Sequence, residues 1–351
     1  MTATRGIDVA PNLHLAHVSD VLLTWTVFLY AFAMFGYAAE FAATRRAEAR
    51  GGTADTAGAA AAGRGQRAGI RWFGRVAVGL TIAGWFVHVS AVTTRGFAVH
   101  RVPWGNMYEF SCMVTLVAVT VFLALLARHR VRNLGAFVMA PVVLYLGLAG
   151  TVLYAAPGPL VPALNSYWIK IHVVAAITAT GSFLISGVIT ILYLLKDRWE
   201  RGRPPLRLQL ASWLRSPMRP ARVSLGPGTA AAVEMGVARG GLMRALPSAA
   251  VLDRLAYRVI TFAFPIWTFA IIAGAIWAEQ AWSRYWGWDP KETWSFITWL
   301  GYAAYLHARA TAGWRGRKAA TLSLVAFGCL LVDYYVVNTV ITGLHSYAGI
   351  S

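Results

Sequence analysis

Residues 107–127 read MYEFSCMVTLVAVTVFLALLA, a run in which Glu109 is the only charged side chain. About 20 consecutive apolar residues form a helix long enough to cross the hydrocarbon core of a bilayer, roughly 30 Å thick. Further runs of comparable length and composition lie near 20–42, 74–94, 135–155, 168–195, 256–278, 292–311 and 321–342. The sequence therefore predicts an all-α, polytopic integral membrane protein, a helical bundle with about eight transmembrane helices.

The composition agrees with a membrane protein and argues against a nucleic-acid-binding protein. Of the 351 residues, 58% are hydrophobic and 13% are charged, whereas a soluble chain carries about 25% charged residues. The net charge of +18 comes from Lys and Arg that fall between the apolar runs, which is the pattern of cytoplasmic loops. Cys112 and Cys329 lie inside apolar runs, and the chain contains no CxxCH motif, so it is neither a disulfide scaffold nor a c-type cytochrome.

The distribution of positive charge predicts the orientation in the membrane. Lys and Arg concentrate in alternate connections, at 43–75, 128–132, 196–255 and 309–318. The connection 156–167 and the C-terminal tail 343–351 contain neither residue. Because positively charged loops stay on the cytoplasmic side, both termini are predicted to lie outside. We expect a multi-pass protein of the cell membrane with its functional face outside the cytoplasm.

This pattern divides the chain into five predicted parts. They are the outer N-terminus and first span (1–42), a basic, flexible cytoplasmic linker (43–73), spans two to five (74–195), a basic cytoplasmic connection (196–255), and spans six to eight (256–351). The linker is predicted to be flexible because much of it is rich in Gly, Ala and Thr.

The most unusual stretch is the tryptophan segment, residues 281–299, which reads AWSRYWGWDPKETWSFITW and is predicted on the outer side. Its aromatic side chains include Trp282, Tyr285, Trp286, Trp288, Trp294 and Trp299. An interfacial aromatic belt explains one or two tryptophans near a helix end. Aromatic faces also stack well on a large planar ligand, so an interfacial belt and a planar-ligand platform both remain open on the residues alone.

Within this segment, Asp289-Pro290-Lys291-Glu292 has the pattern of a helix start. Asp289 would be the N-cap, Pro290 the first helical residue, and Glu292 the residue that completes a capping box three positions after the cap. We favour this supporting role over direct catalysis by either carboxylate.

Four of the eight histidines lie in or beside predicted spans, where ionisable side chains are costly and are candidates for function. His172 lies about one turn inside the outer end of the fifth span, and His345 directly follows the eighth. Two neutral imidazoles on the same side of the membrane are suited to ligate haem iron. His88 and His307 are predicted at different depths, roughly 10 and 21 Å from the outer side, so a shared iron is a weaker prediction for that pair.

At this point the residues resemble a known family. Trp286 to Thr293 (WGWDPKET) is similar to the tryptophan-rich WWD signature of haem-handling proteins. Four further stretches resemble the CcsA- or ResC-type cytochrome c biogenesis family, named CcsB in some bacteria: 103–109 (PWGNMYE), 166–168 (SYW), 305–307 (YLH) and 343–347 (GLHSY). The resemblance covers most of the chain from residue 72 onward. Ser283 is a departure, because the family usually has Gly there.

The resemblance implies a role for each group of residues. His172 and His345 would ligate haem b at the outer site, whereas His88 and His307 would hold haem on its way out. The implied haem platform consists of Trp282, Tyr285, Trp286, Trp288, Asp289 and Trp294.

The family also implies partners and a reaction. The partners are a ResB-type membrane protein, apocytochrome c and, indirectly, a thiol-reducing thioredoxin-like protein. Together with the ResB-type partner the chain would form a haem exporter and holocytochrome c synthetase. Its own contribution would be to position haem for attachment to CxxCH motifs, without acid–base catalysis. Two other classes remain open: a membrane electron carrier with b-type haems, and a secondary transporter for another planar solute.

Overall fold

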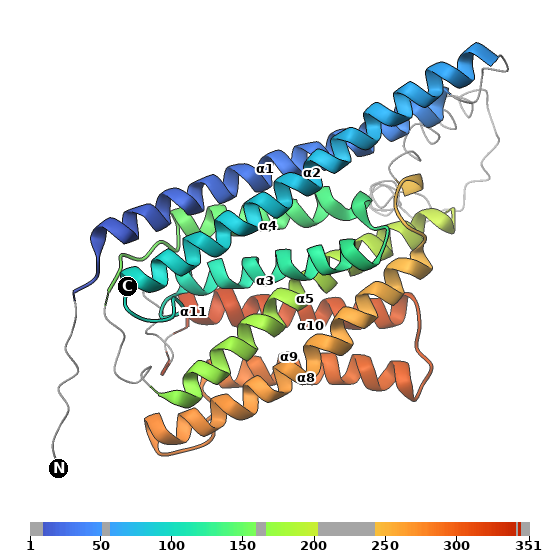
Figure 1. Ribbon diagram of the computed structural model, residues 1–351. Helices are drawn as coiled ribbons and strands as arrows, with labels where there is room; N and C mark the ends of the chain where they lie inside the picture. The colour runs from blue at the N-terminus through green and yellow to red at the C-terminus, as the bar shows by residue number, and fades with distance from the viewer. Residues whose placement is uncertain (1–9, 51–56, 159–165, 203–242, 342, 345–351) are drawn as a thin grey trace, which may run out of the picture.

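The computed structural model describes residues 10–50, 57–158, 166–202, 243–341 and 343–344. Within those ranges the regular structure is entirely helical. The elements, in chain order, are α1 (Leu13–Arg50), α2 (Ala57–Ala98), α3 (Met107–Arg128), the 3₁₀ turn η2 (Arg132–Leu134), α4 (Gly135–Thr151), α5 (Tyr167–Glu200), α8 (Ala249–Trp282), α9 (Pro290–Ala310), α10 (Arg317–Leu331), the π-helical turn η4 (Val332–Val336) and α11 (Val337–Thr339) (Figure 1).

The helices confirm the predicted polytopic membrane bundle. In the described ranges, seven helical segments are long and apolar enough to cross a membrane. The remaining predicted run, 292–311, corresponds to α9, whose 21 residues also suffice for a span. This helix is more polar at its ends, with Lys291 and Glu292 in the first turn and His307 and Arg309 in the last. The chain is therefore a multi-pass membrane protein.

Helix extends into the predicted linker 43–73. Within this segment α1 continues to Arg50 and α2 begins at Ala57, and the flexibility of the segment stays a prediction. Only 51–56 lies outside the described residues. The start of α2 reads AGAAAAGRGQRA, and Ala has the highest intrinsic helix propensity. Alanine therefore extends the helix beyond the apolar run, where composition alone had suggested a linker.

The helices form three closely packed antiparallel pairs (Figure 1). Helix α1 lies along α2, α5 lies along α8, and α9 lies along α10. Helix α5 also packs on α3 and α10, and α1 also packs on α4. Consequently α5 joins the α1–α4 group to the α9–α10 pair, and α8 packs against α5 and α9.

Small residues allow close approach between neighbouring helices, as is common in membranes. A Cβ atom at Gly181 of α5 would meet the Val114 carbonyl oxygen of α3 at 2.7 Å. Likewise, a Cβ atom at Gly301 of α9 would meet Ala326 of α10 at 2.8 Å. On α5, Phe183 stacks on Tyr302 of α9 with ring centroids 3.9 Å apart. These contacts fix α9 and its tryptophan-rich N-terminal side against α5 and α10.

Candidate functional site

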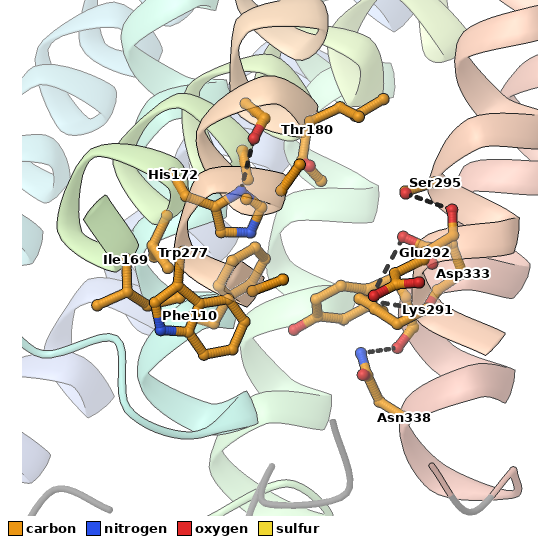
Figure 2. Close-up of a pocket in the computed structure, with 18 of the residues that line it drawn as sticks. Phe110, Ile169, His172, Thr180, Trp277, Lys291, Glu292, Ser295, Asp333 and Asn338 are labelled. Atoms are coloured by element: carbon orange, nitrogen blue, oxygen red, sulfur yellow. Dashed lines mark hydrogen bonds and ion pairs between the residues drawn. The ribbon is translucent and has the colours of Figure 1, made fainter. Parts of the chain in front are cut away.

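A cavity lies where the loop before α3, the N-terminal part of α5, the C-terminal part of α8, the start of α9 and the turn η4 meet. Its volume is about 180 Å³, whereas one water needs roughly 10–15 Å³. Figure 2 shows its two sides: His172 with Ile169 and Trp277 on one, and Lys291, Glu292 and Asp333 on the other. The cavity thus combines a largely apolar wall that carries an imidazole with an opposite wall that carries charged groups.

His172 is held in one orientation by a hydrogen bond to the neighbouring helix. Its Nδ1 atom lies 2.7 Å from the carbonyl oxygen of Ala270 on α8. A carbonyl oxygen only accepts hydrogen bonds, so Nδ1 carries the proton and donates it. In a neutral ring, Nε2 is then the basic nitrogen. Metal-binding histidines commonly have this arrangement, in which a hydrogen bond at one nitrogen orients the other toward the metal.

Gly274 makes room for that imidazole. A Cβ atom at this position of α8 would lie 2.7 Å from His172 Nδ1 and 2.9 Å from its Cε1. Both distances are shorter than real Cβ contacts allow. The ring therefore lies directly against the backbone of α8, which only a glycine at 274 permits.

The tryptophan segment contributes part of the cavity wall. Helix α8 ends at Trp282, and α9 begins at Pro290. Of the predicted platform residues, Trp282, Tyr285 and Trp286 line the cavity. Trp288 is 67% exposed and contacts Trp286 edge-on, with ring centroids 5.7 Å apart.

The other two tryptophans of the segment lie on α9 beyond the cavity wall. Trp294 is half-buried there. Trp299 stacks on Phe296 and Phe264. The aromatic residues of the tryptophan segment therefore have three positions. Some line the cavity, one forms an exposed rim, and others pack along α9.

Ser283, the departure from the family pattern, occupies the C-cap of α8 with a left-handed backbone (φ 55°, ψ 34°). Glycine takes this conformation without steric cost, and it is the usual residue at such a position. The turn into the tryptophan segment therefore favours glycine, and Ser283 adopts the backbone that a glycine would take.

The tetrad Asp289–Glu292 forms the start of α9. Asp289 is the N-cap, Pro290 is the first helical residue, and Glu292 completes a capping box. Glu292 Oε2 accepts hydrogen bonds from the backbone N–H groups of Gly287 (2.8 Å) and Asp289 (3.1 Å). One carboxylate oxygen therefore holds the loop that carries the tryptophans.

The same tetrad is joined to two other parts of the chain. Lys291 Nζ donates to the Asp333 carbonyl oxygen (2.9 Å) and lies 3.4 Å from its Oδ2. Asp333 belongs to η4, a π-helical turn of the kind often found at functional sites. Asp289 Oδ1 accepts a hydrogen bond from the Leu344 N–H (2.8 Å). His345, the next residue, lies outside the described residues.

The second predicted pair of histidines is not brought together. His88 is fully buried in α2, with Nδ1 3.4 Å from the Tyr30 hydroxyl of α1. His307 is exposed on α9. Helix α2 packs mainly on α1, and α9 packs mainly on α10. A shared haem between them stays a prediction.

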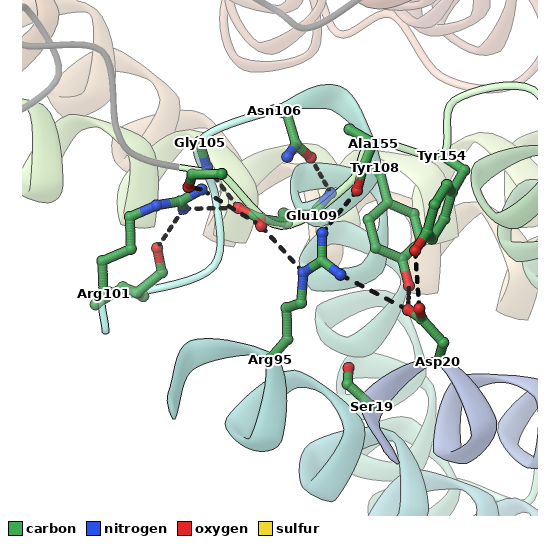
Figure 3. Close-up of polar contacts among 12 residues, drawn as sticks. Ser19, Asp20, Arg95, Arg101, Gly105, Asn106, Tyr108, Glu109, Tyr154 and Ala155 are labelled. Carbon is green, nitrogen blue, oxygen red and sulfur yellow. Dashed lines mark hydrogen bonds and ion pairs between the residues drawn. The ribbon is translucent and has the colours of Figure 1, made fainter. Parts of the chain in front are cut away.

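Sequence reasoning missed the wall formed by the loop before α3. Trp104, Gly105 and Asn106 line the cavity, and the fully buried Glu109 holds their loop (Figure 3). Glu109 Oε2 accepts from the Gly105 N–H (3.0 Å) and from Arg101 Nη1 (2.7 Å). The available signal was a carboxylate within an apolar run, four residues after a glycine.

A buried arginine connects this loop to α1 and α2. Arg95 of α2 donates through Nε to Glu109 Oε1 (3.2 Å) and lies 3.7 Å from Asp20 Oδ1 of α1 (Figure 3). Asp20 also accepts hydrogen bonds from the hydroxyls of Tyr108 (3.1 Å) and Tyr154 (2.8 Å). The cluster therefore fixes the ends of α1, α2 and α3 relative to the cavity.

Comparisons with known proteins agree with the resemblance noted from the motifs. The model of the cytochrome C assembly protein family matches residues 104–345. This range begins at Trp104, the first residue that lines the cavity, and ends at His345. Helices α1 and α2 precede it.

Individual relatives cover most of this chain and most of their own length. The cytochrome c biogenesis protein CcsA of Gloeobacter violaceus is 38% identical over 280 residues, covering 74% of this chain and 82% of the relative. The protein of the same name from Synechococcus sp. (strain JA-2-3B'a(2-13)) is 37% identical over 311 residues, covering 78% and 83%. That of Trieres chinensis is 33% identical over 252 residues, covering 71% and 78%.

Proposed function

This chain belongs to the cytochrome c assembly protein family, and from that membership we propose that it binds haem b in the cavity beside the tryptophan segment. It presents the haem at the outer face of the cell membrane for covalent attachment to the CxxCH motif of apocytochrome c. Haem is the cargo in this scheme, and the chain supplies the site that holds and orients it.

The orientation of His172 is the observation that carries this proposal. Its Nδ1–H is occupied by the Ala270 carbonyl, so Nε2 is the nitrogen with a lone pair for iron. Trp277 and Phe110 line the cavity with His172, and aromatic and apolar walls suit the flat faces of a porphyrin. The donor and its surroundings therefore fit haem.

The exposed rim favours delivery over permanent storage. Tyr285, which lines the cavity, is 61% exposed, and Trp288, which contacts Trp286 of the cavity wall, is 67% exposed. A haem that serves electron transfer is usually enclosed between helices, whereas a haem that another protein must reach needs an accessible edge. We therefore prefer delivery to the alternative of a b-type electron carrier.

The proposed reaction assigns positioning to this chain and chemistry to its substrates. Apocytochrome thiols add across the vinyl groups of haem, and a fixed haem raises the effective concentration of the reacting groups. The thiols must be reduced first, which is the indirect role proposed for a thioredoxin-like protein. A ResB-type membrane protein is the proposed partner in the assembled synthetase, and His345 is the proposed second axial ligand.

Maturation of a reporter cytochrome tests the proposal. The full chain is produced with a ResB-type partner and a CxxCH-containing apocytochrome, and covalent haem is measured on the reporter. His172→Ala and His345→Ala should each abolish attachment. His14→Ala, an exposed histidine in the first turn of α1, is the matched control and should retain it. Normal holocytochrome levels in both ligand variants would sink the proposal.

A further inference from the structure

We infer that a single buried water molecule is bound at the outer ends of α1, α2 and α3, where Ser19, Arg95 and Tyr108 line a second, smaller cavity. We call it the Arg95 cavity. The water is a fixed part of the fold and joins the first two helices to the helix that follows the loop 104–106. The inference does not depend on haem, because haem takes no part in this site.

The Arg95 cavity has the size of one water molecule. Its volume is about 10 Å³, and a water needs roughly 10–15 Å³. Ser19 of α1, Arg95 of α2 and Tyr108 of α3 line it, and each is only 3% exposed (Figure 3). Larger solutes do not fit in this space, so water is the ligand that its size favours.

Arg95 supplies the hydrogen-bond donor for this water. Its Nε donates to Glu109 Oε1 (3.2 Å), and its Nη2 donates to the Ala155 carbonyl oxygen (2.7 Å). Nη1 is buried, lies 3.7 Å from Asp20 Oδ1, and makes no hydrogen bond within the described residues. A contact of that length is too long for a direct hydrogen bond and suits a bridging water. Because a buried donor without a hydrogen bond is costly, Nη1 calls for one.

Two hydroxyl oxygens supply the acceptors. Ser19 Oγ donates its hydrogen to the Ala91 carbonyl oxygen (2.8 Å), and the Tyr108 hydroxyl donates its hydrogen to Asp20 Oδ1 (3.1 Å). A hydroxyl has one hydrogen, so each oxygen can only accept a further bond. A water that accepts from Arg95 and donates to both hydroxyls makes three hydrogen bonds, the usual number for a buried water.

The charges around the cavity favour a neutral ligand over an ion. Glu109 pairs with Arg95 (3.2 Å) and with Arg101 (2.7 Å), and Asp20 Oδ1 lies 3.7 Å from Arg95. Two carboxylates thus balance two guanidinium groups. Since a buried ion needs an opposite charge of its own, neither a cation nor an anion is favoured here.

The position of the water gives it a structural role. Ser19 and Arg95 belong to α1 and α2, which precede the residues that the family model matches, whereas Tyr108 lies inside that range. Tyr108 also closely follows the loop 104–106, which lines the larger cavity. The water therefore strengthens the connection between the first two helices and the loop that forms part of the cavity wall.

Radiolytic hydroxyl-radical labelling of the full chain in detergent detects such a water, because radicals formed from a bound water oxidise the side chains beside it. Cys112 lines the Arg95 cavity and is buried, and it should be oxidised in the wild type. Met139, a buried sulfur side chain within an apolar cluster, is the matched control and should stay unmodified. Ser19→Ala removes one acceptor and should lower the labelling of Cys112 severalfold.

A double-mutant cycle tests whether one water connects the two hydroxyls. Ser19→Ala and Tyr108→Phe each remove an acceptor of the same water, although the two hydroxyls donate to different atoms. The change in the unfolding equilibrium constant of the double variant should therefore be about fivefold smaller than the product of the single changes, the equivalent of one net hydrogen bond. Ser19→Ala combined with Tyr154→Phe is the control, because Tyr154 donates to Asp20 without lining the cavity, and these effects should multiply.

Three outcomes would overturn the inference. They are labelling of Cys112 as weak as that of Met139, unchanged labelling of Cys112 in Ser19→Ala, and purely multiplicative effects in the Ser19–Tyr108 cycle. The labelling of the wild type decides the question even where a variant folds poorly. Each of these outcomes leaves the proposed function untouched, since the measurements are made without haem.

Discussion

Replacing Gly274 with alanine should displace the His172 imidazole while leaving the helix intact. The new Cβ atom would lie 2.7 Å from His172 Nδ1, whereas ordinary van der Waals contact begins near 3.4 Å. The ring must therefore retreat by about 0.7 Å, the difference between those distances. That movement strains or breaks the 2.7 Å hydrogen bond to the Ala270 carbonyl.

The size of the effect follows from the geometry of metal ligation. Metal–ligand distances tolerate deviations of only about 0.2 Å, so a shift of about 0.7 Å exceeds what the bond can absorb. Loss of the partner that orients a ligating histidine typically lowers metal affinity by about 10- to 100-fold. We therefore expect the Kd for haem to rise at least about tenfold. Alanine favours a helix over glycine by roughly 0.5–1 kcal/mol, so α8 itself should not be destabilised.

Haem titration of the purified variant, followed by Soret absorbance, measures this change. Gly150→Ala of α4 is the control, because a Cβ atom there meets nothing within 4 Å. Thermal unfolding of both variants shows whether the fold is preserved. A wild-type Kd in Gly274→Ala would refute the assignment of His172 as the haem ligand.

Two further predictions concern the loop before α3 and the orientation of the chain. Glu109→Ala leaves Arg95 buried without its main partner, which should cost about 3–5 kcal/mol, and it also frees the Gly105 N–H. Its thermal unfolding midpoint should fall well below that of the wild type, and an unchanged midpoint would contradict the role of the ion pair. In a background without native cysteines, Gly158→Cys should react with an impermeant thiol reagent from outside and Gly313→Cys from the cytoplasmic side. The reverse pattern would invert the predicted topology.

The helices were largely predictable because membrane burial leaves a strong signal in a single sequence. The run 107–127 corresponds to α3, Met107–Arg128, almost residue for residue. The apolar runs do not show where helix continues beyond the span, as in the alanine-rich start of α2 at Ala57. The length of an apolar run indicates how many residues cross the membrane. Helix propensity determines how far the helix continues outside the membrane.

Those features of the site that adjacent residues encode could be predicted from the sequence. The cap at Asp289 and Glu292 follows from four adjacent residues, and the structure has that capping box. The bond from Asp289 to Leu344 joins positions 55 apart, and no local pattern indicates it. The same holds for Gly274 opposite His172, since apolar spans do not reveal which face of one helix meets which neighbour.

The central claim is that His172 holds haem at the outer cavity, and the absorbance spectrum of the purified protein tests it most directly. The wild type, purified with the proposed ResB-type partner, should carry haem with a six-coordinate spectrum. His172→Ala should lose that haem or change its spectrum, with partial restoration by added imidazole. An unchanged haem spectrum in His172→Ala would contradict the claim and place the haem elsewhere in the bundle.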